Sequence, residues 1–276
     1  MFMFRNKTKK QNGKSSIPRT VAPNVPKKIY SIANLQGVGR RARQEDSFST
    51  ANVFDEEKMA QNGMLFVVCD GMGGMRDGKL ASETAISSIR ASFMDMDRNG
   101  DIAHQLKESI YIASERVEEL LEGEGGSTVV AGIIYKDELY YASVGDSYFY
   151  LKRGDNVYRL NKEHNMCNQV YLSCIREGEL DPSIGRTHEE AVALTQFLGM
   201  YGFEDVDCFI KPMPIREGDV LLACSDGVGG VLNEREIYEA LSLSEPQEMC
   251  TYIEERIKVY NKSNQDNYTA IVVQCK

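Results

Sequence analysis

The chain has 276 residues, of which 42% are hydrophobic, and a formal net charge of −9 at pH 7. The length suits one large domain or two small ones, and the apolar fraction is that of a folded globule. An acidic globule repels the phosphates of nucleic acids, so we expect no nucleic-acid partner. No stretch approaches the roughly 18 consecutive apolar residues of a membrane span, and we expect none.

The cysteines and the first residues bear on the compartment in which the protein works. Seven cysteines are scattered along the chain, and none forms a CxxC pair. The first residues have neither the apolar stretch nor the cleavage site of a secretory signal. We therefore expect a cytoplasmic protein with reduced thiols, rather than a disulfide or zinc framework.

Residues 1–28 differ in composition from the rest of the chain. They include eight lysines and arginines, no acidic residue, and several prolines. A segment of this kind buries too little apolar surface to order itself, so we predict a disordered basic tail. Such a run is most often a solvated leader, and contact with an anionic surface or a partner is the alternative.

From residue 29 onward the sequence predicts folded structure, beginning with strands. Three strands are expected at 29–36, 46–54 and 64–69, and the last is a continuous apolar run. Two helices follow, because apolar residues recur at helical spacing over 86–96 and over 102–121. Asp101 stands where it can cap the second helix.

The pattern then returns to strands joined by tight turns. These strands are expected at 127–135, 138–145, 147–153 and 157–160, with turns at 136–137 and 154–156. Consecutive strands with tight turns predict an antiparallel meander. Residues 161–205, which we call the flap segment, are irregular with helical pieces, and connections this long are usually functional or mobile.

The last part of the chain mixes strands with a pair of helices. Strand-like segments occupy 207–215 and 219–224, helices are expected at 234–241 and 247–260, and a final strand at 268–275. Paired helices between antiparallel strands indicate an α+β fold, with two sheets and helix layers outside them. No internal repeat or change of composition appears after residue 29, so we predict one domain over 29–276.

Acidic residues recur where the predicted strands begin or end. They are Asp70 after MLFVVC, Asp226 after DVLLACS, Asp146 after ELYYASVG, Asp266 before YTAIVV, and Glu45 and Asp46 before SFSTA. A single acid at such a place usually caps a turn. Several carboxylates gathered on one rim repel one another, and bound cations relieve that repulsion.

The residue types favour hard cations and a phosphate. Carboxylate and carbonyl oxygens suit Mg²⁺ or Mn²⁺ rather than zinc, and Gly71 lets its backbone approach an ion closely. The glycines of DGMGG could instead cradle a phosphate, but no GK[ST] follows and no GxGxxG is complete. Arg41, four residues before Glu45, can hold phosphate oxygens bidentately. The residues alone thus indicate metal-assisted hydrolysis of a phosphoester.

The chain resembles the metal-dependent protein Ser/Thr phosphatases of type 2C, in their bacterial branch. The segments that carry the resemblance are RRARQEDS, VVCDGMGG, GSTVVAGIIY, ASVGDSYFYL, LACSDGV and QDNYTAIVV, in the order expected for the family. It implies a central antiparallel β-sandwich flanked by pairs of helices, in four αββα layers. It also implies hydrolysis of phosphoserine and phosphothreonine in proteins by a hydroxide bridging two Mn²⁺ or Mg²⁺ ions, with a cognate Ser/Thr kinase as a further partner. We expect a monomer.

The resemblance also assigns roles to single residues. Asp70 bridges the two ions, Asp226 and Asp266 complete the ligands of one, and Glu45 with the carbonyl of Gly71 serves the other. Asp46 holds a metal-bound water. Asp146, with Asp226, fits a weaker third metal position, and Arg41 binds the substrate phosphate.

The sequence departs from the family pattern at three positions. Gln44 replaces a usual Asn, Gly230 replaces an acid found near the third metal in many members, and Met72 replaces a histidine of eukaryotic members. His164 resembles part of a motif at the start of the flap segment, and a structural role near the site stands beside an ordinary loop position. The flap segment is expected to contact the substrate protein.

Two other functions compete with this one. A domain of the same fold could be a catalytically weak regulatory binding module, but the acids at Glu45, Asp70, Asp226 and Asp266 are all present. A small-molecule phosphohydrolase would need a deep closed pocket, whereas an open site bordered by the flap segment favours a phosphoprotein.

Overall fold

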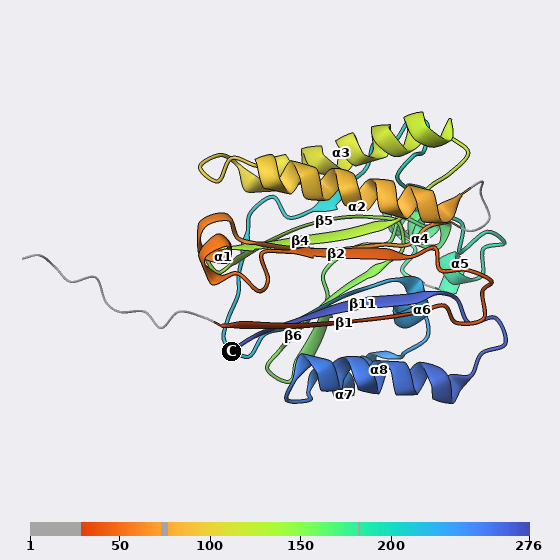
Figure 1. Cartoon of the computed structure of the whole chain (residues 1–276). Helices are drawn as coiled ribbons and strands as arrows, with labels where there is room; N and C mark the ends of the chain where they lie inside the picture. The colour runs from red at the N-terminus through yellow and green to blue at the C-terminus, as the bar shows by residue number, and fades with distance from the viewer. Residues whose placement is uncertain (1–28, 73–76, 182) are drawn as a thin grey trace, which may run out of the picture.

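The computed structural model describes residues 29–72, 77–181 and 183–276. The predicted tail over 1–28 lies outside these ranges. Two antiparallel sheets pack face to face, and a pair of helices covers the outer face of each (Figure 1). The α+β class and the four αββα layers expected from the sequence are confirmed.

The first sheet joins strands from both ends of the chain. Its strand order is β1 (Tyr30–Gly37), β11 (Tyr268–Cys275), β10 (Val220–Cys224), β6 (Tyr148–Arg153) and β7 (Asn156–Arg159). The register sets Tyr30 opposite Cys275 and Cys224 opposite Ala270. The helices α7 (Glu234–Leu241) and α8 (Pro246–Tyr260) cover this sheet (Figure 1).

The second sheet holds the strands from the middle of the chain. Its order is β2 (Ser47–Ala51), β3 (Met64–Cys69), β4 (Val129–Tyr135), β5 (Glu138–Val144) and β8 (Asp207–Cys208), and β9 (Met213–Pro214) also pairs with β5. The helices α2 (Gly78–Asp95) and α3 (Ile102–Leu121) pack on its outer face (Figure 1). Asp101 caps α3 as predicted, because its side chain accepts a hydrogen bond from the His104 N–H.

The expected meander is wrong at one point. The strands β4 and β5 pair in the second sheet, whereas β6 and β7 pair in the first. The chain therefore crosses between the sheets at 145–147, and Asp146 lies in this crossing. Alternation of apolar residues shows that a strand has a buried face, but it does not show which sheet the strand joins.

The structure also contains short helices, of which those in the flap segment were expected only as helical pieces without bounds, and the others were not predicted. They are α1 (Glu56–Asn62), α4 (Met166–Arg176) and α5 (Ser183–Arg186) in the flap segment, and α6 (Asp226–Gly229) after β10. The side chain of Asp55 caps α1, which has no buried residue and therefore no apolar period to reveal it. None of the described helices is long and apolar enough to cross a membrane.

The sandwich brings particular strand ends to one end of the molecule. Because neighbouring strands are antiparallel, the ends of β3, β5 and β10 lie beside the beginnings of β2, β4, β6 and β11. The acids that follow or precede these strands are therefore neighbours in space. The interior between the sheets is apolar and includes Phe66 and Phe149, whose ring centroids are 5.9 Å apart.

Replacing Phe149 by alanine is expected to destabilise the fold strongly. The side chain is fully buried between the sheets and contacts the rings of Phe66 and Tyr141. Phe149→Ala should lower the free energy of unfolding by about 3–5 kcal/mol, measured by urea denaturation. Tyr158→Ala, on an exposed strand, is the control and should cost far less. A loss for Phe149→Ala as small as that of the control would contradict this packing.

Candidate active site

One cleft at the strand-end face of the sandwich gathers the predicted site residues. It has a volume of about 220 Å³. Its lining includes Arg41, Glu45, Asp70, Gly71, Asp146, Asp226 and Asp266. Asp46 does not line the cleft but lies fully buried beside it. Segments from five separate regions of the chain thus meet at the strand ends where the acids were predicted.

Asp70 lies at the centre of these contacts. Its backbone is fixed to the start of β4, because Thr128 N donates to Asp70 O over 2.9 Å and Asp70 N donates to Thr128 Oγ1 over 3.1 Å. Ser127 Oγ also donates to Asp70 O over 2.9 Å. Burial is the main reason that the pKa of the Asp70 carboxyl lies well above its ordinary value, and the charges of Asp46 and Asp226 raise it further.

Gly71 is required by a close approach between backbones. A Cβ atom at this position would lie 2.1 Å from the carbonyl oxygen of Gly78, at the start of α2. No side chain fits there, so the segment after β3 can pass directly under the N-terminal end of α2 only as glycine. This packing sets Asp70 and the Gly71 backbone at the wall of the cleft.

Asp46 is anchored by the opposite sheet. Ser225 Oγ donates to Asp46 Oδ2 over 2.8 Å and accepts from Thr269 N over 3.0 Å. The other carboxylate oxygen, Oδ1, is buried with no hydrogen-bond partner. Burial raises the pKa of Asp46 to about 6. A cation in the cleft, or a water bound to such a cation, would satisfy this buried oxygen.

Asp226 and Asp146 form another wall of the cleft. Asp226 is the first residue of α6, and its Oδ1 is also buried without a partner. Burial, and then the charge of Asp266, raises the pKa of Asp226. Burial, and then the charge of Asp226, raises the pKa of Asp146 to about 7. Both carboxyls thus lie where a negative charge is costly in the absence of a cation.

Arg41 is the cationic side chain within the cleft lining. Its Nη2 contacts Asp266 Oδ2 over 2.5 Å, and this contact raises the pKa of the guanidinium. The arginine side chain remains about half exposed, at 54%. It therefore lies at the mouth of the cleft, where an incoming phosphate can reach it.

Asn267 is a structural residue to which the sequence analysis gave no role. Its Nδ2 donates to Val38 O and Arg43 O, and its Oδ1 accepts from Glu45 N over 2.7 Å. One buried amide therefore joins the loop between β1 and β2, which carries Arg41 and Glu45, to the start of β11. Its only signal in the sequence is a polar residue directly before an apolar strand, which is also typical of ordinary turns.

Ser225, Thr128 and Lys79 also support the site and were not predicted. Lys79 Nζ donates to Asp46 O and to Ser47 Oγ, each over 3.0 Å. Thr128 also lines the cleft, whereas Ser225 and Lys79 do not. Serine, threonine and lysine are common at strand and helix ends, so sequence alone does not distinguish these three.

The arrangement fits hard divalent cations. Five carboxylates and the Gly71 backbone border one small cleft, and two of the buried oxygens near it lack partners. Within 29–72, 77–181 and 183–276, no three His, Cys, Asp or Glu side chains already form a closed ligand set. Carboxylates gathered around one cleft repel one another, and bound cations relieve that repulsion.

The departures from the family pattern have clear places in the structure. Gln44 bonds Gly37 O through Nε2 and accepts from Asp46 N, so it supports the turn that carries Asp46. Met72 lines the cleft with an apolar thioether. The backbone N–H of Gly230 bonds Asp226 O, and the residue offers no carboxylate beside Asp146.

His164 has a structural role near the site, one of the two possibilities left open by the sequence. The side chain is buried, and its Nδ1 accepts from Gly145 N over 3.2 Å. His164 N also donates to Gly145 O over 2.9 Å. Burial lowers the pKa of the imidazole, so the neutral form is favoured. It therefore joins the flap segment to the chain crossing at Asp146.

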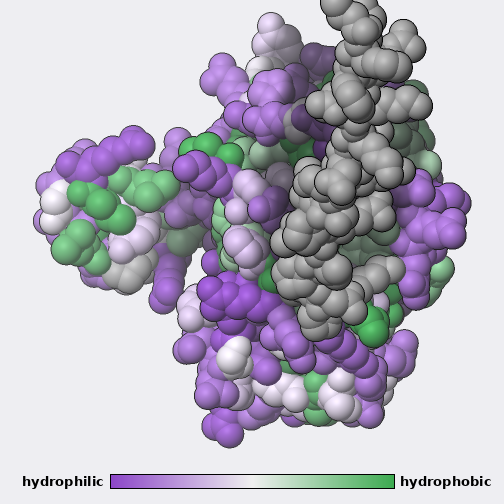
Figure 2. All heavy atoms as spheres, turned by 90° about the vertical axis from the view of Figure 1, so that its left-hand side faces the viewer, coloured by the Kyte–Doolittle hydropathy of each residue, from purple (hydrophilic) through white to green (hydrophobic). Residues whose placement is uncertain are grey.

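The flap segment stands out from the sandwich. It forms the lobe that projects at the left of Figure 2, with hydrophobic side chains among hydrophilic ones. Val192 from this segment is 85% exposed and lines the cleft together with Leu194. The cleft is thus bordered on one side by an exposed surface that a protein substrate can contact.

The buried thiols next to the acids are not nucleophiles. Cys69 and Cys224 precede Asp70 and Ser225 and are fully buried. Burial raises the pKa of both, to about 12 for Cys224. All seven cysteines are free, as the sequence predicted.

Comparison with known proteins gives one consistent result. The model of the family described as protein phosphatase 2C matches residues 32–214. The serine/threonine phosphatase stp of Listeria welshimeri serovar 6b is 28% identical over 225 residues, covering 77% of this chain and 85% of its own length.

Solved structures share the fold over nearly their whole length. The PPM Ser-Thr phosphatase MsPP from Mycobacterium smegmatis, solved with cacodylate, is 27% identical with a TM-score of 0.70, over 88% of this chain and 97% of that one. The catalytic domain of the phosphatase PstP, solved with two manganese ions, is 24% identical with a TM-score of 0.70, over 90% and 99%. This chain belongs to the protein phosphatase 2C family, whose members are metal-dependent protein serine/threonine phosphatases.

Proposed function

We propose that the strand-end cleft is the active site and that it removes phosphate from phosphoserine and phosphothreonine in proteins. The observation that carries the proposal is the convergence of five carboxylates, the Gly71 backbone and Arg41 on one cleft. Asp70, Asp226 and Asp266 would hold one Mn²⁺ or Mg²⁺ ion, and Asp70, Glu45 and the Gly71 carbonyl a second. Bound ions of this kind supply Lewis acidity and lower the pKa of a coordinated water.

The residues of this chain would orient the reaction. Arg41 can donate two parallel hydrogen bonds to the phosphoryl oxygens, because its side chain lies at the mouth of the cleft. Asp46 has one buried unpartnered oxygen with which to orient a water, while Ser225 fixes its other oxygen. The apolar Met72 offers no proton, so solvent would protonate the leaving alkoxide.

A third, weaker cation would lie between Asp146 and Asp226. Both carboxyls line the cleft, and the charge of Asp226 contributes to the raised pKa of Asp146. Gly230 removes one ligand that this position has in many members of the family. The proposal therefore places two ions at the core of the site and gives the third a lower affinity.

Phosphoproteins are favoured over small phosphoesters by the form of the cleft. It is small, and it is bordered by the exposed flap residue Val192 rather than by a deep enclosure. A cognate Ser/Thr kinase would supply these substrates. We further propose that the protein works as a monomer in the cytoplasm, and that residues 29–276 form one catalytic domain.

Replacing Asp70 tests the central assignment. Asp70→Asn removes a charged ligand shared by the two cations, so it should lower kcat on a phosphothreonine peptide by about 10²-fold or more with Mn²⁺ present. Phosphate release and Mn²⁺ binding by calorimetry are the measurements. The melting temperature of the metal-free variant should equal or exceed that of the wild type, because a repelling charge has been removed. Full activity in a folded Asp70→Asn variant would refute the assignment.

The raised pKa of Asp146 predicts a pH-dependent stability in the metal-free protein. The folded-state pKa of about 7 exceeds the ordinary value of 3.8, so folding favours the protonated form. That stabilisation is complete below the ordinary value and is lost as the pH rises through about 7.

Urea denaturation in chelator, at about pH 5 and about pH 7.5, tests this pH dependence. At the higher pH, Asp146→Asn should be about 1–2 kcal/mol more stable than the wild type, and at the lower pH the difference should shrink. Comparing the two proteins cancels the titration of the other acids. An equal difference at both pH values would contradict the pKa direction.

A further inference from the structure

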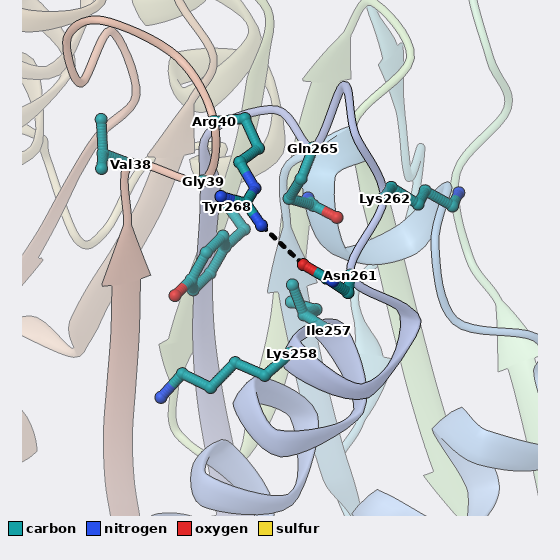
Figure 3. A pocket seen from close by; sticks show the side chains of 9 residues that line it. All are labelled: Val38, Gly39, Arg40, Ile257, Lys258, Asn261, Lys262, Gln265 and Tyr268. Atoms are coloured by element: carbon teal, nitrogen blue, oxygen red, sulfur yellow. Dashed lines mark hydrogen bonds between the residues drawn. The ribbon is translucent and has the colours of Figure 1, made fainter.

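A second hollow lies beside the active-site cleft and carries the opposite charge. It is bounded by the loop after β1 and by the C-terminal end of α8 (Figure 3). Its volume is about 430 Å³, and its lining includes Arg40, Lys258 and Lys262 but no acidic residue. We call it the basic hollow. In a chain with a net charge of −9, such a local group of cations attracts anions.

The basic hollow combines an apolar base with cationic sides. Ile257 and Tyr268 are almost fully buried and contribute hydrocarbon surface. Lys258 and Lys262 extend in opposite directions from this base (Figure 3). An anionic side chain with an aliphatic stem suits this combination, because the stem can pack while the charge meets the cations.

The cations retain charge for a ligand. Arg40 Nη2 donates to the neutral amide oxygen of Asn261 over 2.6 Å, so this contact orients the guanidinium without neutralising it (Figure 3). Lys262 Nζ lies 3.4 Å from the neutral carbonyl oxygen of Gly230. Lys258 pairs with Glu254 over 2.9 Å, but both side chains are exposed, and pairs of that kind are weak and exchangeable.

Two backbone segments separate the basic hollow from the active-site cleft. Arg40 lines the hollow while the next residue, Arg41, lines the cleft. Likewise, Gln265 lines the hollow and the next residue, Asp266, lines the cleft. Arg40 N donates to Gln265 O over 2.8 Å, which joins the two segments directly.

The contact between these segments is as close as backbones allow. Gly39 has a φ of +61°, and a Cβ atom there would lie 2.2 Å from Asp266 O. Consecutive Cα atoms are about 3.8 Å apart, so the two spaces are separated by little more than the thickness of these segments. An extended peptide advances about 3.3 Å per residue. Two to four residues of a substrate can therefore reach from the active-site cleft to the basic hollow.

We propose that the basic hollow is a docking subsite for an anionic side chain of the phosphoprotein substrate, two to four residues from the phosphorylated residue. The anionic group is a carboxylate or a second phosphate, since lysine and arginine bind both. This inference rests on the proposed function, because it takes the neighbouring cleft as the place where the phosphorylated residue binds. It predicts that the enzyme prefers substrates with acidic or multiply phosphorylated flanks.

The test compares phosphothreonine peptides that differ only in their flanks. One set carries aspartates two to four residues before or after the phosphothreonine, a second carries a further phosphothreonine there, and a third carries serines. The wild type with Mn²⁺ should show a higher kcat/KM on the first two sets. The double variant Lys258→Gln/Lys262→Gln should lose about three- to tenfold of kcat/KM on these sets and nothing on the serine set.

A matched control separates docking from overall charge. The double variant Lys58→Gln/Lys136→Gln removes two lysines from α1 and from the β4–β5 turn, at the other end of the molecule (Figure 1). It should keep the wild-type preference. An equal loss in both double variants, or an equal loss on all peptide sets, would overturn the proposal.

Two further readouts separate failure of docking from failure of the proposed function. Hydrolysis of p-nitrophenyl phosphate with Mn²⁺ reports the cleft alone and should be equal in the wild type and both double variants. If no phosphoester is hydrolysed, the proposed function fails. In that case docking is tested separately, by measuring the binding of a labelled, unphosphorylated aspartate peptide by fluorescence anisotropy.

Such a peptide should bind the wild type more tightly than Lys258→Gln/Lys262→Gln, by the same three- to tenfold factor. Equal binding would overturn the proposal. Inorganic phosphate added to the same assay distinguishes a free anion from a substrate side chain. If phosphate binds the wild type while aspartate and serine peptides bind alike, the basic hollow is a site for free phosphate and the proposal is wrong.

Discussion

Mutual repulsion among carboxylates is the constraint on which this structure depends. Five of them border a cleft of about 220 Å³, and a sixth, Asp46, is buried beside it. Burial and the neighbouring charges raise the pKa values of Asp70, Asp146 and Asp226. Such an arrangement is costly without compensating cations, so the rest of the fold must hold the acids in place against their repulsion. Bound divalent cations would convert that cost into binding affinity, which is why we propose the active site at this end of the sandwich.

The holding groups are mostly neutral and come from the neighbouring strand or from the opposite sheet. Thr128 and Ser127 fix the backbone of Asp70, Ser225 holds one oxygen of Asp46, and the amide of Asn267 joins the loop between β1 and β2 to the start of β11. Neutral donors position the acids without neutralising them, so the carboxylates keep the charge that a cation requires. The positive charge lies at the edges, with Arg41 at the mouth of the cleft and Arg40 on the far side of the same loop.

The sequence predicted most of the fold and the membership of the cleft, for identifiable reasons. Apolar runs such as 64–69 and the helical period over 102–121 are strong signals, and acids at strand ends must meet when neighbouring strands are antiparallel. The sequence did not predict that β5 and β6 lie in different sheets, because alternation carries no information on the choice of sheet. Nor did it reveal Asn267 or Lys79, whose roles depend on contacts between residues distant in the chain. The basic hollow was missed because Arg40 and Lys258 come together only where α8 packs against β1, far away in the sequence.

The position of β11 has a consequence for how the protein forms during synthesis. This strand follows every other strand of the described residues, yet it lies between β1 and β10 and begins two residues after Asp266. The first sheet therefore stays divided on the ribosome until residues 268–275 have emerged, whereas the second sheet needs nothing beyond β9. Pairing Tyr30 with Cys275 closes a loop that contains almost all of the described residues, and such long-range contacts form slowly. A chain in which β11 has not yet paired also lacks the anchor for the segment that brings Asp266 to the cleft and Asn267 to Glu45, so the cleft is incomplete until that strand is in place.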